Sequence, residues 1–421
     1  MPRPGKKNLL KRFFSVLGPG LVTGAADNDP SGIATYSIAG AQLGMSLLWT
    51  AFVTWPLMAF VQLMCARIGM VTGRGLAGGL RQICPRWLLF IAAAALFGAN
   101  VVTIGADLAG MSDAGQMLTG INSHFLTIFF AIGITLATIY FRYYQIAFVL
   151  KWLTLVLFAY VITAFILKPN WGSVLYHTFI PSWPRGHNAW QSLVAVLGTT
   201  ISPYLFFWQA SQEVEEEKAM GRRMLISREG ATKREILDRR IDVGAGTFFS
   251  NLVMYFIILT TALTLYPHNE RNIESSRQVA EALQPLAGPF AATLYTVGLI
   301  GVGLLAIPIL AGSSAYAFAE TLAWKQGLDK PVRSARYFYG VISVSTLLGI
   351  AMLFVKISPI KALFGASVIN GVLAPFLLVG ILVVASDRKL MERQPSPWLS
   401  RIVVGLTAAI MLIAAGAMFF L

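Results

Sequence analysis

Long apolar runs dominate this sequence of 421 residues and leave few folds open to it. Hydrophobic residues make up 56% of the chain and charged residues only 12%. A helix that crosses a bilayer needs roughly 20 consecutive apolar residues, and runs of about that length recur along the chain. They lie at about residues 13–43, 46–71, 88–118, 124–141, 147–167, 190–211, 241–266, 287–323, 334–355, 361–386 and 398–420. The sequence therefore predicts an all-α polytopic membrane protein with about eleven transmembrane helices in the lipid bilayer.

The basic residues are distributed unevenly between the apolar runs. The net charge is +14, but the Lys and Arg residues lie in the gaps between runs, which argues against a nucleic-acid partner. Most of the 33 fall on the side of the predicted membrane that carries the N-terminus, including a charged connector expected at about 212–240. Basic loops favour the cytoplasmic face. We therefore expect a multi-pass protein of the cell (inner) membrane with its N-terminus in the cytoplasm and its C-terminus outside.

The first apolar run is interrupted near its centre by Asp27-Asn28-Asp29-Pro30-Ser31-Gly32. A charged side chain at mid-bilayer costs at least about 2.5–3.5 kcal/mol, so carboxylates are expected there only where they have a function. Pro30 removes a backbone donor and Gly32 adds conformational freedom, which together predict a broken helix. Irregular backbone is tolerated at that depth only where it is buried in protein or lines a polar cavity. We therefore expect half of a substrate site here, with Asp29 as the main ligand of a divalent cation.

A second interruption occurs in the sixth run, at Gly198-Thr199-Thr200-Ile201-Ser202-Pro203-Tyr204. For Pro30 or Pro203 alone, a simple kink is the alternative interpretation. The first and sixth runs, however, each open a group of five runs, and they enter the membrane from opposite sides. Paired interruptions of this kind indicate a secondary transporter with inverted repeats. We predict a single transport domain over 1–421, with one repeat at about 13–167, a second at about 190–386 and an extra helix at about 398–420.

The side chains around both interruptions offer oxygen atoms to an ion. Besides Asp29 they include Asp27, Thr199 and Ser202, while Gly32 is small enough to leave space for a partly hydrated ion. Oxygen ligands suit magnesium, manganese and calcium, and magnesium usually keeps several of its waters. Two interpretations of Asp27 remain open. It either holds waters around the ion, or it caps the broken helix or faces the inner vestibule.

Other polar residues inside the runs are candidates for an ion or proton pathway. They are Asp107, Asn370 and Gln209. For Asn370, an ordinary hydrogen bond between helices is the alternative. Asp113 lies six residues after Asp107, which corresponds to about 240° of rotation around a helix. The two carboxylates should therefore point to different faces and should not exchange a proton directly.

Several short motifs resemble those of the Nramp family of divalent-metal transporters. They are Gly18-Pro19-Gly20 and Asp29-Pro30 in the first run, Ala106-Asp107-Leu108-Ala109 in the third and Ile201-Ser202-Pro203 in the sixth. The resemblance extends over essentially the whole chain. It implies the leucine-transporter fold, a cation site between the unwound parts of helices one and six, and transport by alternating access.

The sequence also departs from the pattern of the transition-metal members of that family. An asparagine ligand in helix one and a methionine ligand in helix six are replaced by Gly32 and Ser202. Two histidines, one acidic residue and one glutamine of the pattern correspond to Tyr204, Gln209, Gly110 and Leu373. These changes resemble the Nramp-related magnesium transporter branch. They also argue against proton coupling, because titratable groups of the family's proton route are absent.

The sequence favours a secondary transporter or uniporter that carries a divalent cation into the cytoplasm, with Mg²⁺ as the first choice and Mn²⁺ as a second ion. One alternative is a proton-coupled Mn²⁺/Fe²⁺ importer of the Nramp type. Another is a transporter of the same fold for a small organic cation or amino acid, with Asp29 pairing an amine beside Tyr204 and Trp208. An enzyme is not expected, because no intramembrane nucleophile–base pair or phosphate-binding loop is present. No cofactor beyond the transported ion is expected, and the oligomeric state is left open.

Overall fold

Helices account for the architecture of this protein. The computed structural model describes residues 19–140, 153–182, 186–268, 271–354 and 357–420. The helices that follow the predicted runs are α2 (Pro19–Asp27), α3 (Pro30–Leu43), α4 (Leu48–Thr72), α6 (Arg86–Thr119), α7 (Ser123–Tyr140), α9 (Phe158–Ile166), α11 (His187–Thr200), α12 (Pro203–Ala219), α13 (Lys233–Thr264), α16 (Ala291–Leu322), α17 (Arg336–Ile350), α18 (Pro359–Ser386) and α19 (Trp398–Phe420). Shorter helices lie between them: α5 (Leu76–Leu80), α10 (Trp171–Phe179), α14 (Ser276–Glu281) and α15 (Gln284–Ala287).

Each of the eleven predicted runs is helical over most of its described part. Residues 13–18 of the first run, including Gly18, and residues 147–152 of the fifth lie outside the described residues. By length and composition alone, eight helical stretches of the described chain could cross a membrane. One of these, 30–72, joins the first two runs, while α9 and α17 are shorter than the length required. The all-helical, multi-pass prediction is therefore consistent with the structure.

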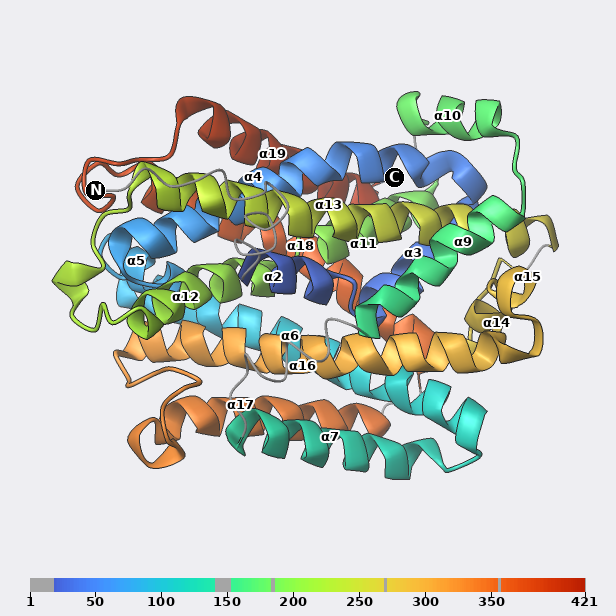
Figure 1. The fold of residues 1–421 in the computed structure, drawn as a ribbon, viewed down its shortest axis with the longest axis horizontal. Helices are drawn as coiled ribbons and strands as arrows, with labels where there is room; N and C mark the ends of the chain where they lie inside the picture. The colour runs from blue at the N-terminus through green and yellow to red at the C-terminus, as the bar shows by residue number, and fades with distance from the viewer. Residues whose placement is uncertain (1–18, 141–152, 183–185, 269–270, 355–356, 421) are drawn as a thin grey trace, which may run out of the picture.

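Most of the long helices run along the longest axis of the molecule, and the interrupted pairs α2–α3 and α11–α12 lie in the middle (Figure 1). Glycine lets neighbouring backbones approach them closely. A Cβ atom on Gly24 of α2 would overlap the backbone of Gly246 on α13, and one on Gly198 of α11 would overlap the backbone of Gly371 on α18. Small residues at helix contacts are a general feature of membrane bundles. They hold both interruptions against long, continuous helices.

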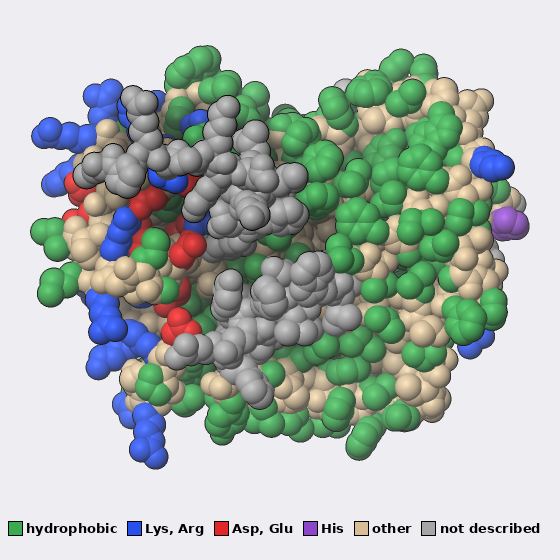
Figure 2. All heavy atoms as spheres, viewed as in Figure 1, with side chains coloured by type: hydrophobic (Ala, Val, Ile, Leu, Met, Phe, Trp, Pro, Cys, Tyr) green, Lys and Arg blue, Asp and Glu red, His purple; other side chains and the backbone are tan. Residues whose placement is uncertain are grey.

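Charge gathers at one end of the molecule. Figure 2 shows Lys and Arg side chains concentrated at the end that carries α5 and the α12–α13 connection, with apolar side chains over the middle. This segregation agrees with the positive-inside argument. The assignment of that end to the cytoplasm stays a prediction.

The expected connector at 212–240 differs from the structure. Helix α12 continues to Ala219 and α13 already begins at Lys233, so the connection is confined to 220–232. The charges that suggested a solvated loop instead form ion pairs, both within and between the two helices. Arg239 forms ion pairs with Glu213 (2.8 Å) and Asp242 (2.6 Å) and also with Glu216. Paired charges can extend helices beyond an apolar run, and a hydropathy pattern does not reveal this.

Candidate cation site between two broken helices

Both predicted interruptions are present and have the same construction. Helix α2 ends at Asp27 and α3 begins at Pro30, whereas α11 ends at Thr200 and α12 begins at Pro203. In each case proline occupies the first helical position, where its missing N–H costs no hydrogen bond. Asp29 caps α3, because its Oδ1 accepts a hydrogen bond from the Gly32 amide at 2.7 Å. Two residues of irregular backbone therefore separate the halves of each helix.

The two interruptions face each other. The Tyr204 hydroxyl at the start of α12 donates to Asp29 Oδ2 and to the Ala26 carbonyl oxygen, both at 3.3 Å. A Cβ atom built on Gly32 would lie 3.2 Å from Thr199 Oγ1, 3.3 Å from the Asp27 carbonyl oxygen and 3.4 Å from Asp29 Oδ1. Oxygen atoms from both broken helices therefore converge beside Gly32.

The Asp29 carboxylate is almost entirely enclosed by protein. Asp29 is 2% exposed, and Asp27, next to the break, is fully buried. The Asp27 carboxylate points to α13, where Ser250 Oγ donates to its Oδ2 at 2.5 Å. Its Oδ1 has no hydrogen-bond partner among the residues that the structure describes. Asp27 thus presents its carbonyl oxygen at the break and its carboxylate to a neighbouring helix.

Asp107 of α6 contacts α3 just after the first interruption. Its Oδ1 accepts a hydrogen bond from Ser31 Oγ at 2.8 Å, while its Oδ2 has no partner within the described chain. Asp113 instead accepts a hydrogen bond from the Ser276 amide of α14 at 3.0 Å. The expected separation of these two carboxylates is confirmed, because they contact different elements.

The remaining predicted residues form hydrogen bonds with partners other than Asp29. Ser202 Oγ donates to the carbonyl oxygens of Thr199 (2.5 Å) and Gly198 (3.1 Å), so its hydrogen is used within its own segment. Asn370 of α18 donates to Thr103 of α6 at 3.3 Å, one turn before Asp107. Gln209 Nε2 donates to Glu213 Oε1 at 2.7 Å, and its amide oxygen accepts from Thr23 Oγ1, also at 2.7 Å. Gln209 therefore links α12 to α2 rather than lining the Asp29 site.

The sequence analysis did not identify several polar residues that form hydrogen bonds around the first broken helix. Ser250 bonds to Asp27, and Thr35 of α3 donates to Ser367 of α18 at 2.8 Å. Serines and threonines are common in transmembrane helices, where many bond only to their own backbone. Their polarity alone did not distinguish these side chains from the others.

The aromatic residues offered for an organic solute do not form one wall. Tyr204 faces Asp29, but the Trp208 ring packs against Tyr316 of α16, with 6.3 Å between ring centroids. Within the described chain, no three His, Cys, Asp or Glu side chains are grouped as metal ligands. Any dication held beside Gly32 would therefore need hydroxyl, carbonyl or water oxygens in addition to Asp29.

The continuous helices, the two facing interruptions and the enclosed carboxylate are the arrangement expected of a multi-pass secondary transporter. Comparison with known proteins agrees with this class. The family model described as natural resistance-associated macrophage protein-like matches residues 20–421. The chain belongs to the Nramp family, a family of divalent metal cation transporters rather than of enzymes.

A curated relative agrees with this family, and solved structures agree with the fold. A relative named divalent metal cation transporter MntH, from Caldanaerobacter subterraneus subsp. tengcongensis, is 26% identical over 99% of this chain and 96% of its own length. The manganese transporter of Eremococcus coleocola, solved with an aromatic bis-isothiourea substituted compound, superposes with a TM-score of 0.74. It shares 17% identity over 100% of this chain and 90% of its own. MhsT in complex with L-phenylalanine superposes with a TM-score of 0.56 and 16% identity over 95% and 97% of the two chains. The family resemblance and the predicted leucine-transporter fold are confirmed.

Proposed function

We propose that this protein carries hard divalent cations, Mg²⁺ first and Mn²⁺ as a second ion, through a site centred on Asp29. The observation that supports the proposal is the convergence of Asp29 Oδ1, Thr199 Oγ1 and the Asp27 carbonyl oxygen beside Gly32. All three atoms are oxygens, and hard oxygen ligands suit Mg²⁺ and Mn²⁺ better than soft metals. A Cβ atom at position 32 would crowd these oxygens, so glycine leaves all three free to face an ion. These features are also the basis for proposing that the chain belongs with the magnesium branch.

The charge on the substrate supplies a driving force. A membrane potential provides about 2.3 kcal/mol per elementary charge per 100 mV, and hence about twice that for a dication. We propose uptake into the cytoplasm, with the basic end of the molecule facing inward. In this scheme the protein transports without stoichiometric proton movement, because Tyr204, Gln209 and Gly110 replace titratable groups of the family's proton route and Asp113 lies at a different contact from Asp107.

The relatives favour a second candidate. They are named for divalent metal cation or manganese transport, so a proton-coupled manganese importer of the Nramp type is the direct alternative. That alternative would use the same Asp29 site, since Mn²⁺ also accepts oxygen ligands. The two candidates differ in ion preference and in proton movement.

One liposome experiment separates them. Purified protein is reconstituted, and uptake of Mg²⁺ and of Mn²⁺ is measured side by side while the internal pH is recorded. Mg²⁺ uptake without acidification of the lumen supports the proposal. Mn²⁺ uptake with metal-dependent acidification, and no Mg²⁺ uptake, favours the manganese importer. Asp29→Ala should abolish uptake in either case and serves as the transport-dead control.

A further inference from the structure

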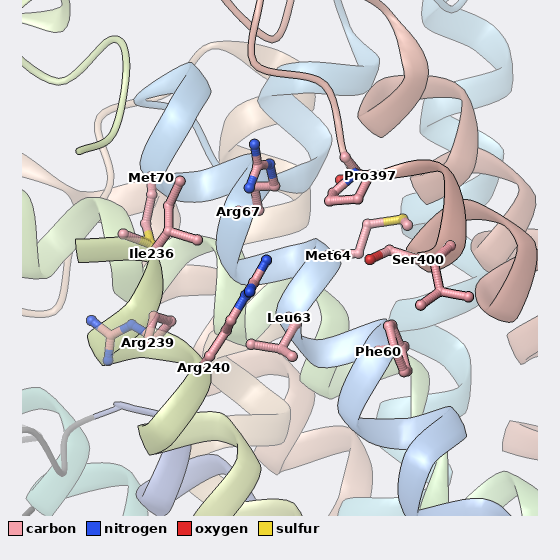
Figure 3. A pocket seen from close by; sticks show the side chains of 12 residues that line it. Phe60, Leu63, Met64, Arg67, Met70, Ile236, Arg239, Arg240, Pro397 and Ser400 are labelled. Carbon is pink, nitrogen blue, oxygen red and sulfur yellow. The ribbon is translucent and has the colours of Figure 1, made fainter. Parts of the chain in front are cut away.

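A cavity of about 330 Å³ lies between α4, α13 and the start of α19, away from the Asp29 site. Figure 3 shows its lining, which combines apolar side chains such as Phe60 and Leu63 with the arginines Arg67 and Arg240. The end of α4 and the starts of α13 and α19 lie at the basic end of the molecule (Figure 1). The cavity therefore lies where the apolar surface gives way to the charged end.

Within the described part of the chain, no acidic side chain neutralises the charge in this cavity. The Arg240 side chain extends toward Arg67, while Arg239 turns away (Figure 3) toward its ion pairs with Glu213 and Asp242. No carboxylate of the described residues forms an ion pair with Arg67 or Arg240. Arg67 is half-buried, and its Nε and Nη2 both donate to the Gln394 carbonyl oxygen at 3.2 Å. The half-buried Arg67 and the exposed Arg240 thus bring two positive charges into one cavity.

A buried hydroxyl adds a further polar group to the same cavity. Ser396 lines it, is 2% exposed, and its Oγ has no partner within the described chain. An unpartnered buried hydroxyl is costly, and neither arginine has a carboxylate partner within the described chain. An anion with several acceptor oxygens would satisfy all three groups, because arginine binds phosphate oxygens through two parallel hydrogen bonds.

We propose that this cavity binds the phosphate headgroup of an anionic phospholipid in the leaflet at the basic end of the molecule. The apolar part of the lining, Phe60, Leu63 and the 49% exposed Leu399, would contact the upper acyl chains. Basic pockets between transmembrane helices are known to hold acidic lipid headgroups. A soluble phosphate would match the arginines but would leave the apolar lining without a partner. The inference does not depend on which cation the Asp29 site carries.

Lipid binding to the full-length protein in detergent provides the test. The probes are a phosphatidylglycerol, a phosphatidylcholine with the same acyl chains, and inorganic phosphate. Bound lipid is counted by native mass spectrometry, and the melting temperature is followed during titration. We expect the phosphatidylglycerol to bind and raise the melting temperature, whereas the phosphatidylcholine and phosphate should have much smaller effects. Removing one arginine should weaken binding about fivefold, and removing both about 25-fold.

The variants are Arg240→Gln and the double variant Arg67→Gln/Arg240→Gln. Arg240 is exposed, so its single variant should fold even if the double variant does not. Arg234→Gln is the matched control, because Arg234 lies on the same helix with 81% of its side chain exposed and outside the cavity. Equal binding of both lipids by the wild-type protein would overturn the proposal. So would an equal loss in Arg234→Gln and Arg240→Gln, or stabilisation by phosphate alone.

Discussion

Replacing Asp29 by asparagine separates its two roles at the broken helix. The Asp29 carboxylate caps α3 through the Gly32 amide and supplies the negative charge at the point where the two interruptions meet. Asparagine is as good a helix cap as aspartate, and its amide oxygen can accept the same hydrogen bond. The substitution therefore keeps the cap and removes the charge. Asp29→Ala, by contrast, removes both.

The structure sets the expected size of each effect. Asp29 is 2% exposed, so a dication bound to it would form a largely desolvated charge pair. Removing one partner of such a pair typically costs about 2–5 kcal/mol, which corresponds to a loss of affinity between about 30-fold and several thousand-fold. The free energy of unfolding should fall by less than about 1 kcal/mol in Asp29→Asn. In Asp29→Ala the free energy of unfolding should be lower by about another 1 kcal/mol than in Asp29→Asn, because the helix cap is lost as well.

Calorimetric titration with Mg²⁺ and Mn²⁺, liposome uptake and thermal unfolding measure these quantities together. Asp113→Asn is the matched control, because Asp113 lies on α6 and contacts the Ser276 amide instead of the interruption. It should bind and transport normally. Unchanged cation affinity in Asp29→Asn would refute the reasoning and move the site elsewhere. A large loss of folding stability in Asp29→Asn would instead mean that the charge itself holds the two broken helices together.

Three further predictions concern ion selectivity, proton movement and the contact between α2 and α13. The double variant Gly32→Asn/Ser202→Met should raise Cd²⁺ affinity relative to Mg²⁺ by about tenfold or more in competition binding, because a thioether favours soft metals; an unchanged ratio would mean that neither position faces the ion. Mg²⁺ uptake should leave the lumen pH unchanged, and metal-dependent acidification that disappears in Asp107→Asn would restore the proton-coupled alternative. Asp242 accepts hydrogen bonds from the Gly20 and Leu21 amides at 2.8 and 3.0 Å, so Asp242→Asn should loosen α2 from α13. Distances between spin labels on these two helices should then show that the population with separated helices has increased by about tenfold. Identical distance distributions in the variant and the wild-type protein would contradict this prediction.

The interruptions themselves were predictable from the sequence because their causes are local. A proline lacks an N–H wherever it stands, and an aspartate just before it can cap the helix that follows. Asp29-Pro30 and Ser202-Pro203 therefore located both breaks to the residue. The all-helical, multi-pass character was equally accessible, since each apolar run must satisfy its own backbone as a helix in lipid.

Contacts across the bundle were decided by tertiary packing. Nothing near Asp27 in the sequence indicates that Ser250 will donate to its carboxylate, and nothing near Thr35 indicates that its hydroxyl will reach Ser367. Such pairs depend on the rotation and depth of helices that are far apart in the chain. Close contacts of small residues fix these variables, and hydropathy does not encode them. The same reason explains why 212–240 reads as a charged loop, although the ion pairs of Arg239 bind the ends of two helices to each other.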